Sequence, residues 1–133
     1  MITANEARAI IAAGEARAAQ INVPVNIAVL DTGAHLKAFG RMDGALLGSI
    51  DIAITKARTA ALFGMATETV GEFCKPGGTS PGLEQTNGGL VVFAGGLPLL
   101  DSDGAIVGAV GVSGGSVSQD RDIAEAAAAA LSF

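Results

Sequence analysis

Two segments of the sequence each run from apolar residues through an aspartate and a glycine into further apolar residues, and this pattern constrains the fold most strongly. The first is interrupted at Asp31 to Gly33 and the second at Asp101 to Gly104. Asp and Gly are favoured in the tight turns that join antiparallel strands. We therefore predict two β-hairpins, with strands at residues 25–31, 35–42, 97–101 and 105–113.

Helical patterns surround the two hairpins. Thr3 and Glu6 have the spacing of a capping box, which predicts a first helix that ends before Pro24. Residues 47–64 repeat apolar side chains at the helical period, which predicts a second long helix. Ser118 precedes an alanine-rich segment and is the expected cap of a C-terminal helix.

The segment between the second helix and the second hairpin is expected to hold a short turn or helix at residues 67–73 and a further strand at 90–94. Two hairpins separated along the chain by helices are typical of an α+β fold. They are not typical of a fold in which single strands and helices alternate. The sequence therefore predicts an α+β fold, in which helices pack against an antiparallel sheet.

The composition predicts one domain that associates with copies of itself. The chain has 133 residues, of which half are apolar and 16% are charged. This length suits a single domain over residues 1–133. Because so few charged residues cannot cover the surface, we expect part of the apolar surface to lie in the contacts of a homo-oligomer.

Charge and hydropathy argue against several kinds of partner. The net charge is −5 and the eight Lys and Arg residues are scattered, which argues against nucleic-acid binding. The chain has no stretch near the roughly 18 to 20 uninterrupted apolar residues of a membrane span and no pattern of a signal peptide. Cys74 is the single cysteine and has no partner for an internal disulfide, so we expect a cytoplasmic protein.

A glycine-rich loop covers residues 74–89 and contains five glycines and two prolines. Loops of this length in compact domains usually bind a ligand, close over a site or link two parts of the chain. The sequence fits neither the dinucleotide-binding nor the P-loop pattern. Its backbone amides could still form an anion-accepting concavity beside Thr79 and Ser80. The alternative is an ordered connector that packs its own Leu83.

Two basic residues are candidates for binding an anion. Lys56 lies on the predicted second helix among apolar side chains, so its ammonium must reach solvent or meet an anion in a partly apolar cleft. Arg41, at the end of the first hairpin, could supply a second cation for a carboxylate. The alternative is that both form structural ion pairs, with Asp43, Asp51 or Glu84 as partners.

The sequence contains no evident protein metal site. One histidine, one cysteine and dispersed carboxylates do not supply a zinc set. A haem group needs only one or two axial contacts from the protein. The side chains that could provide one are His35, Met42, Met65 and Cys74, and each is better explained as a packing residue.

Ordered motifs along nearly the whole chain carry a family resemblance. They are "RMDGA", "SIDIAITKARTAA", "PGG", "GGLP" and "GVSGGSVSQD". With these motifs the chain resembles the DUF336-type family of GlcG-like proteins, the haem-binding protein HbpS and the C-terminal domain of PduO-type adenosyltransferases. The resemblance implies a profilin-like fold, with a five-stranded antiparallel sheet flanked by helices and a common tendency to form higher oligomers. It also implies haem as a possible cofactor.

The resemblance maps onto individual positions of this chain. These are Arg41, Met42, Asp43, Gly44, Asp51, Lys56, Pro76, Gly77, Gly78, Gly95, Gly96 and Pro98. It assigns no residue to a haem iron.

Three functions are consistent with these features. The first is a cytoplasmic, oligomeric binding protein that holds a small anionic ligand such as haem. The cofactor-binding residues would then be Arg41, Met42, Lys56, Pro76, Gly77, Gly78 and Thr79. The second is an enzyme without a metal, which acts on a small organic acid and uses Lys56 or Glu84 to move a proton. The third is a structural assembly partner of another protein.

Overall fold

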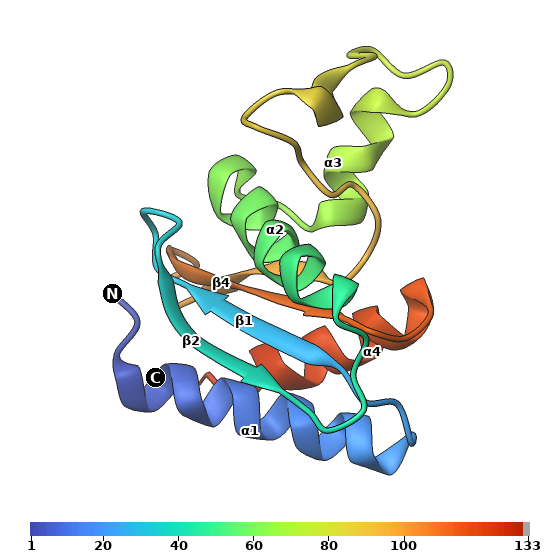
Figure 1. Ribbon diagram of the computed structural model, residues 1–133. Coiled ribbons are helices and arrows are strands. Elements are labelled where there is room, and N and C mark those ends of the chain that lie inside the picture. Colours follow the sequence, from blue (N-terminus) through green and yellow to red (C-terminus); the bar gives the residue numbers. More distant parts are fainter. Residues whose placement is uncertain (132–133) are drawn as a thin grey trace.

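The structure is a computed structural model of the chain and describes residues 1–131 (Figure 1). In chain order, its elements are α1 (Ala4–Gln20), β1 (Asn26–Leu30), β2 (Leu36–Arg41), α2 (Gly48–Phe63), α3 (Thr67–Cys74), the short 3-10 helix η1 (Leu83–Gln85), β3 (Gly96–Leu100), β4 (Ile106–Ser113) and α4 (Val117–Ala128).

Both predicted hairpins form, and together they make the sheet. The strand order is β2-β1-β4-β3, and all three neighbouring pairs are antiparallel. The Asp31 carboxylate accepts hydrogen bonds from the amides of Gly33 and His35, and Asp101 accepts from Asp103 and Ala105 in the same way. Each aspartate therefore stabilises the turn of its own hairpin, which is the role that the sequence predicted.

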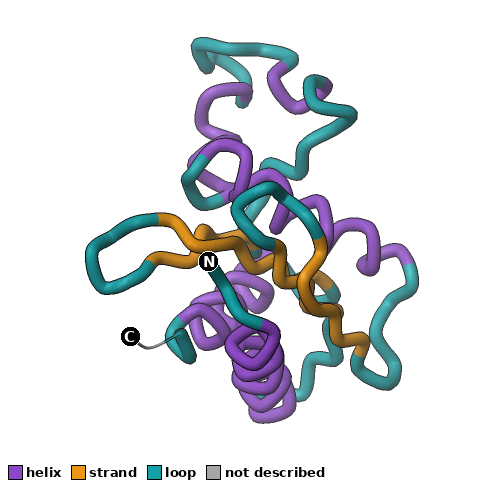
Figure 2. Tube along the Cα trace, turned by 90° about the vertical axis from the view of Figure 1, so that its left-hand side faces the viewer, coloured by secondary structure: helices purple, strands orange, loops and turns teal. Residues whose placement is uncertain are grey.

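Helices cover both faces of the sheet. Figures 1 and 2 show α1 and α4 on one face and α2 on the other. Alternate residues of β1 belong to the two different cores, with Ile27 and Val29 packed under α1 and α4, and Ala28 and Leu30 under α2. The structure is thus an α+β arrangement with an antiparallel sheet flanked by helices, as the sequence predicted.

The described residues form four strands rather than five, because the predicted strand at 90–94 does not form. The backbone of this segment bonds away from the sheet. The Val91 amide donates to the Thr59 hydroxyl on α2, and the Leu90 amide donates to the Glu84 carbonyl. The apolar run at 90–94 is a connection packed on α2 and not a strand. The profilin-like classification stays a prediction.

The C-terminal helix begins earlier than predicted. Ser116, and not Ser118, is the N-cap, since its hydroxyl accepts a hydrogen bond from the Gln119 amide and the Gln119 side chain accepts one from the Ser116 amide. This reciprocal capping box satisfies two amides that Ser118 could not reach. At the other end of the chain, the predicted box of Thr3 and Glu6 is confirmed.

An extended arm rises from the α2 side of the molecule. It consists of α3 and residues 75–95, and in Figures 1 and 2 it projects beyond α2 and away from the sheet. η1 interrupts it, so the predicted loop at 74–89 is partly structured. Among the described residues, no helix is long and apolar enough to cross a membrane.

An ion pair joins α1 and α4 on the far side of the sheet. Arg17 donates to both carboxylate oxygens of Asp122, at 2.8 to 3.3 Å. The hydrogen bond to Arg17 lowers the pKa of Asp122 below its ordinary value of 3.8.

This ion pair predicts a specific dependence of stability on acid. A carboxyl whose pKa is lowered by folding stabilises the folded state above its unfolded pKa and loses that effect as pH falls through the folded pKa. In urea unfolding, the free energies of unfolding of the wild type and of Asp122→Asn should therefore differ at neutral pH. They should converge below about pH 3.8. A difference that stays constant down to pH 2 would show that the pair does not act through its charge.

Candidate functional site

Two adjoining hollows form a groove between α3, residues 92–94 and the start of α4. Their volumes are about 380 and 580 Å³, and they share Glu68, Ala94 and Val117. We call this feature the α3–α4 groove. Its apolar wall comprises Val92, Phe93, Ala94 and Val117, and its charged side chains are Glu68, Glu72, Lys75, Glu84 and Arg121.

Lys56 lies beneath this groove and is completely buried. Its Nζ donates a hydrogen bond to the Val112 carbonyl at 2.8 Å and to Oδ2 of Asp120 at 3.0 Å. The Phe93 ring lies over the ammonium, with its centre 5.0 Å from Nζ. Two acceptors and an aromatic face therefore surround a group that has three N–H donors.

Asp120 completes the pair from the first turn of α4. Its Oδ1 accepts a hydrogen bond from the Gly115 amide, while Oδ2 binds Lys56. Burial lowers the pKa of Lys56, and the charges of Asp120 and Glu68 act in the opposite direction. We assign the charged form to the pair, since both side chains have hydrogen-bond partners that fit an ammonium and a carboxylate.

This geometry corrects the predicted environment of Lys56. The sequence suggested Asp43, Asp51 or Glu84 as its structural partner, whereas the partner is Asp120, 64 residues along the chain. Lys56 neither reaches solvent nor lines the groove, because α4 brings a carboxylate to it inside the core. Direct contact between Lys56 and a ligand stays a prediction, and it requires Phe93 to move aside.

Glu68 lies in the wall that both hollows share. Its two carboxylate oxygens are shielded from solvent and have no hydrogen-bond partner among residues 1–131. Nε of Arg121 is 3.4 Å from Oε2 of Glu68, which supplies charge compensation. A shielded carboxylate without a hydrogen-bond donor is costly in free energy, so this wall can accept a hydrogen bond from a ligand or a water molecule.

Glu84 lies in the groove beside Cys74. The hydrogen bond with Glu84, together with burial, raises the pKa of the Cys74 thiol. Cys74 is therefore held as a thiol at neutral pH and is a weak nucleophile. Glu84 reaches the groove as a candidate proton carrier, but the structure places it at Cys74 and not beside Lys56.

Cys74, Lys75 and Glu84 of the glycine-rich loop line the groove, but the predicted binding residues at 76–79 do not. Pro76, Gly77 and Thr79 are exposed, and the Gly78 amide donates to the Lys75 carbonyl at 2.7 Å. This hydrogen bond forms a turn at the end of α3, so the Gly78 amide is already occupied within the loop. Its role as a ligand-facing lid stays a prediction.

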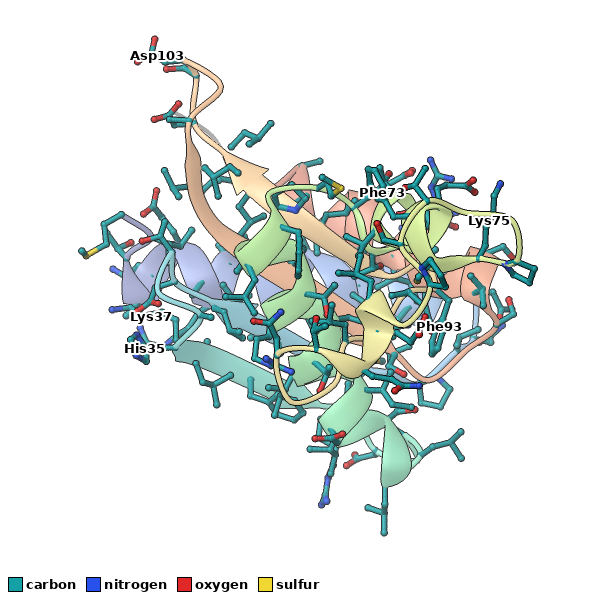
Figure 3. All side chains as sticks on the ribbon, turned by 90° about the horizontal axis from the view of Figure 1, so that it is seen from above. His35, Lys37, Phe73, Lys75, Phe93 and Asp103 are labelled. Carbon is teal, nitrogen blue, oxygen red and sulfur yellow. The ribbon has the colours of Figure 1, made fainter. Side chains whose placement is uncertain are left out.

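Arg41 and Met42 lie at a different place in the fold. Arg41 is exposed at the end of β2, and the Met42 sulfur accepts a hydrogen bond from the Val25 amide at 3.5 Å. Met42 and Asp43 line a separate hollow of about 350 Å³ beside the end of α1. His35 is largely exposed on its hairpin turn, and Figure 3 shows it on the opposite side of the molecule from Phe93. The structure therefore divides the predicted binding residues between two locations.

Comparison with known proteins places the chain in a family. A family model described as "Haem degrading protein HbpS-like" matches residues 2–129. The chain belongs to this HbpS-like family. It is 43% identical to an uncharacterized 15.0 kDa protein encoded in the dhaT-dhaS intergenic region of Citrobacter freundii, over 95% of this chain and 89% of that protein.

Two further relatives extend the HbpS-like comparison. Protein GlcG of Escherichia coli strain K12 is 42% identical over 80% of this chain and 77% of its own length. The crystal structure of a PduOC:heme complex superposes with a TM-score of 0.91 and 37% identity, covering 98% of this chain and 94% of that chain. The family resemblance predicted from the sequence motifs is confirmed.

The sequence reasoning missed several residues of the groove. No role was assigned to Glu68, Phe93 or Arg121, which line the groove, and Asp120, the buried partner of Lys56, was not predicted either. The motif "GVSGGSVSQD" contained a usable signal, because a glycine turn between a strand and a capped helix places Asp120 at the helix start. No local pattern could have revealed Glu68 or Phe93.

Proposed function

We propose that this HbpS-like chain binds haem, or a closely related anionic tetrapyrrole, in the α3–α4 groove. The observation that carries the proposal is an apolar wall with a few charged side chains placed around it, two of them basic, in one groove. Ligand sites usually combine predominantly apolar walls with a small number of placed polar groups. The similarity to the PduOC:heme complex over almost the whole chain supports haem as the ligand.

Particular residues of this chain would contact haem in the groove. Val92, Phe93 and Val117 would contact the apolar macrocycle, and Arg121 and Lys75 would face its propionates. Bound haem would supply an iron centre whose properties depend on its axial contacts. In the groove, Cys74 is held in its thiol form by Glu84, so the protein does not offer a thiolate there at neutral pH.

Proton transfer on a small organic acid is the second candidate function. The observation that favours it is the shielded Glu68 carboxylate, which lies in the groove wall above the Lys56 and Asp120 pair. A carboxylate in the wall of a ligand groove is positioned to act as a general base. Under this hypothesis Glu68 replaces Lys56 or Glu84 as the first residue to test.

Self-association in the cytoplasm belongs to the same proposal. Leu46, Leu47 and Phe73 have side chains that are 42 to 70% exposed, and Phe73 lies on the projecting arm. Large exposed apolar side chains are typical of surfaces that bind another protein. A homo-oligomer or an assembly partner would cover them.

A haem titration with matched surface variants tests the binding proposal. We expect a saturable, stoichiometric Soret band for the wild type. Val117→Asp should weaken binding at least about tenfold, which corresponds to about 1.4 kcal/mol, because it places a carboxylate against the macrocycle and near its propionates. Leu36→Asp changes a similarly exposed apolar residue on β2 and should leave the affinity unchanged.

Two results would contradict haem binding in this groove. An absorbance rise that does not saturate would exclude specific binding. Equal affinities of Val117→Asp and the wild type would place haem somewhere else. In the first case, a screen of small carboxylic acids for thermal stabilisation, repeated with Glu68→Gln, would test the second candidate function.

A further inference from the structure

The guanidinium group of Arg121 is engaged along one edge. Its Nε donates to Oε1 of Glu125 at 3.0 Å and lies 3.4 Å from Oε2 of Glu68. Within residues 1–131, the hydrogen bond of Arg121 uses Nε. Its two terminal nitrogens, Nη1 and Nη2, make no hydrogen bond to that part of the chain, and 57% of the side chain is exposed.

The two acidic partners fix the orientation of this guanidinium. Glu125 holds Nε from the next turn of α4, while Glu68 holds it from α3. A guanidinium carries five N–H donors in a planar fork, so the Nη edge keeps four donors after Nε–H is used. This edge matches the two oxygens of a carboxylate, and its orientation is set before a ligand arrives.

Two carboxylates, Glu68 and Glu125, face Nε of Arg121, and the ammonium of Lys56 is already paired with Asp120. The case for carboxylate binding therefore rests on the N–H donors of the Nη edge and not on an excess of positive charge. Lys75, the other basic residue of the groove, differs because its single ammonium, at the C-cap of α3, is paired with Glu72 of that helix.

The position of Arg121 suits a ligand that is apolar at one end and anionic at the other. Val117 and Arg121 are four residues apart on α4, so their side chains lie on the same side of the helix. Both line the 580 Å³ hollow. A ligand that packs on Val117 and Ala94 thus brings a carboxylate of suitable reach to the Nη edge.

We propose that Arg121 is the specificity-determining residue of the groove and binds a carboxylate of the ligand through Nη1 and Nη2. The inference rests on the proposed haem-binding function, in which the carboxylate is a propionate. It goes beyond that function because it assigns the preference for the free acid over its ester to the Nη edge of Arg121.

Changing the ligand and the protein together tests this assignment. Ferric haem and its dimethyl ester, which lacks both propionate charges, are titrated into wild type, Arg121→Gln and Arg121→Lys in the same cosolvent. We expect the wild type to prefer the free acid at least about tenfold, as for loss of one charge-assisted bidentate contact. Arg121→Gln should abolish this preference by weakening the acid and leaving the ester unchanged. Arg121→Lys should keep part of the preference, because it retains the charge and loses the fork.

Control variants identify the source of any preference for the acid. Arg41→Gln removes a basic residue that does not line the groove and should keep the wild-type ratio of affinities, whereas Lys75→Gln removes the other basic residue of the groove and should lower the ratio less than Arg121→Gln does. If Arg121→Gln keeps that ratio, or if Lys75→Gln abolishes it, the assignment to Arg121 is wrong while haem binding stands. If neither the acid nor the ester binds the wild type, the proposed function itself fails. Since Arg121 is a surface residue, urea unfolding should show that its variants remain folded.

Discussion

Lys56→Met is expected to lower the free energy of unfolding by about 3 to 5 kcal/mol, the cost of leaving one charge of a buried ion pair without its partner. Methionine has nearly the length of lysine and fills most of the same space. What it removes is the ammonium that donates to Asp120 and to the Val112 carbonyl. Asp120 is almost fully buried, so its carboxylate would lose its counter-ion without gaining water. Urea unfolding followed by circular dichroism measures the change.

The double variant Lys56→Met/Asp120→Asn is the matched control. Asparagine can still accept the hydrogen bond from the Gly115 amide, and no buried charge is left unpaired. We expect the double variant to recover most of the stability that the single variant loses. A loss below about 1 kcal/mol for Lys56→Met would mean that Asp120 is easily hydrated or protonated, contrary to its burial.

This prediction affects how binding data on Lys56 are interpreted. Phe93 lies over the ammonium and also forms part of the groove wall. Removal of the ammonium would therefore disturb the wall even if Lys56 never contacts a ligand. If Lys56→Met loses haem affinity and the double variant regains it, Lys56 has a structural role. A loss in both variants would support direct contact, as the sequence suggested.

Gly111→Ala is expected to destabilise the fold by about 3 kcal/mol, at the upper end of the usual cost of overpacking. Gly111 lies on β4 where α2 crosses the sheet. A β-carbon at this position would overlap the carbonyl oxygen of Ala53 and lie 2.6 Å from the amide nitrogen of Ala57. Both atoms belong to the backbone of α2, so a rotamer change cannot relieve the overlap. The whole helix would have to move away from the sheet.

Gly48→Ala provides the matched control for this prediction. Gly48 begins α2, and a β-carbon there would meet no atom within 4 Å. Alanine is a better helix former than glycine, so this variant should be neutral or more stable by up to about 1 kcal/mol. Thermal unfolding of both variants makes the comparison. If Gly111→Ala is as stable as Gly48→Ala, α2 does not pack as closely on the sheet as the structure shows.

The amino-acid sequence by itself determined the elements whose stabilising contacts are local. The aspartates of both hairpins bond to amides two and four residues later, and Thr3 bonds to the amide of Glu6. Interactions of this range leave a readable pattern of residue types. For the same reason, the helical period of residues 47–64 was sufficient to place α2. The ordered motifs also identified the HbpS-like family correctly.

Tertiary structure decided which distant residues meet. Lys56 pairs with Asp120 across 64 residues, and its burial follows from how α2 and α4 pack on opposite faces of the sheet. The apolar run at 90–94 suits a strand or a packed connection equally well, and the hydroxyl of Thr59 on α2 decides between them. Phe93 and Arg121 reach one groove from separate elements. Such contacts depend on the packing of whole helices, and the residue types near each position do not encode them.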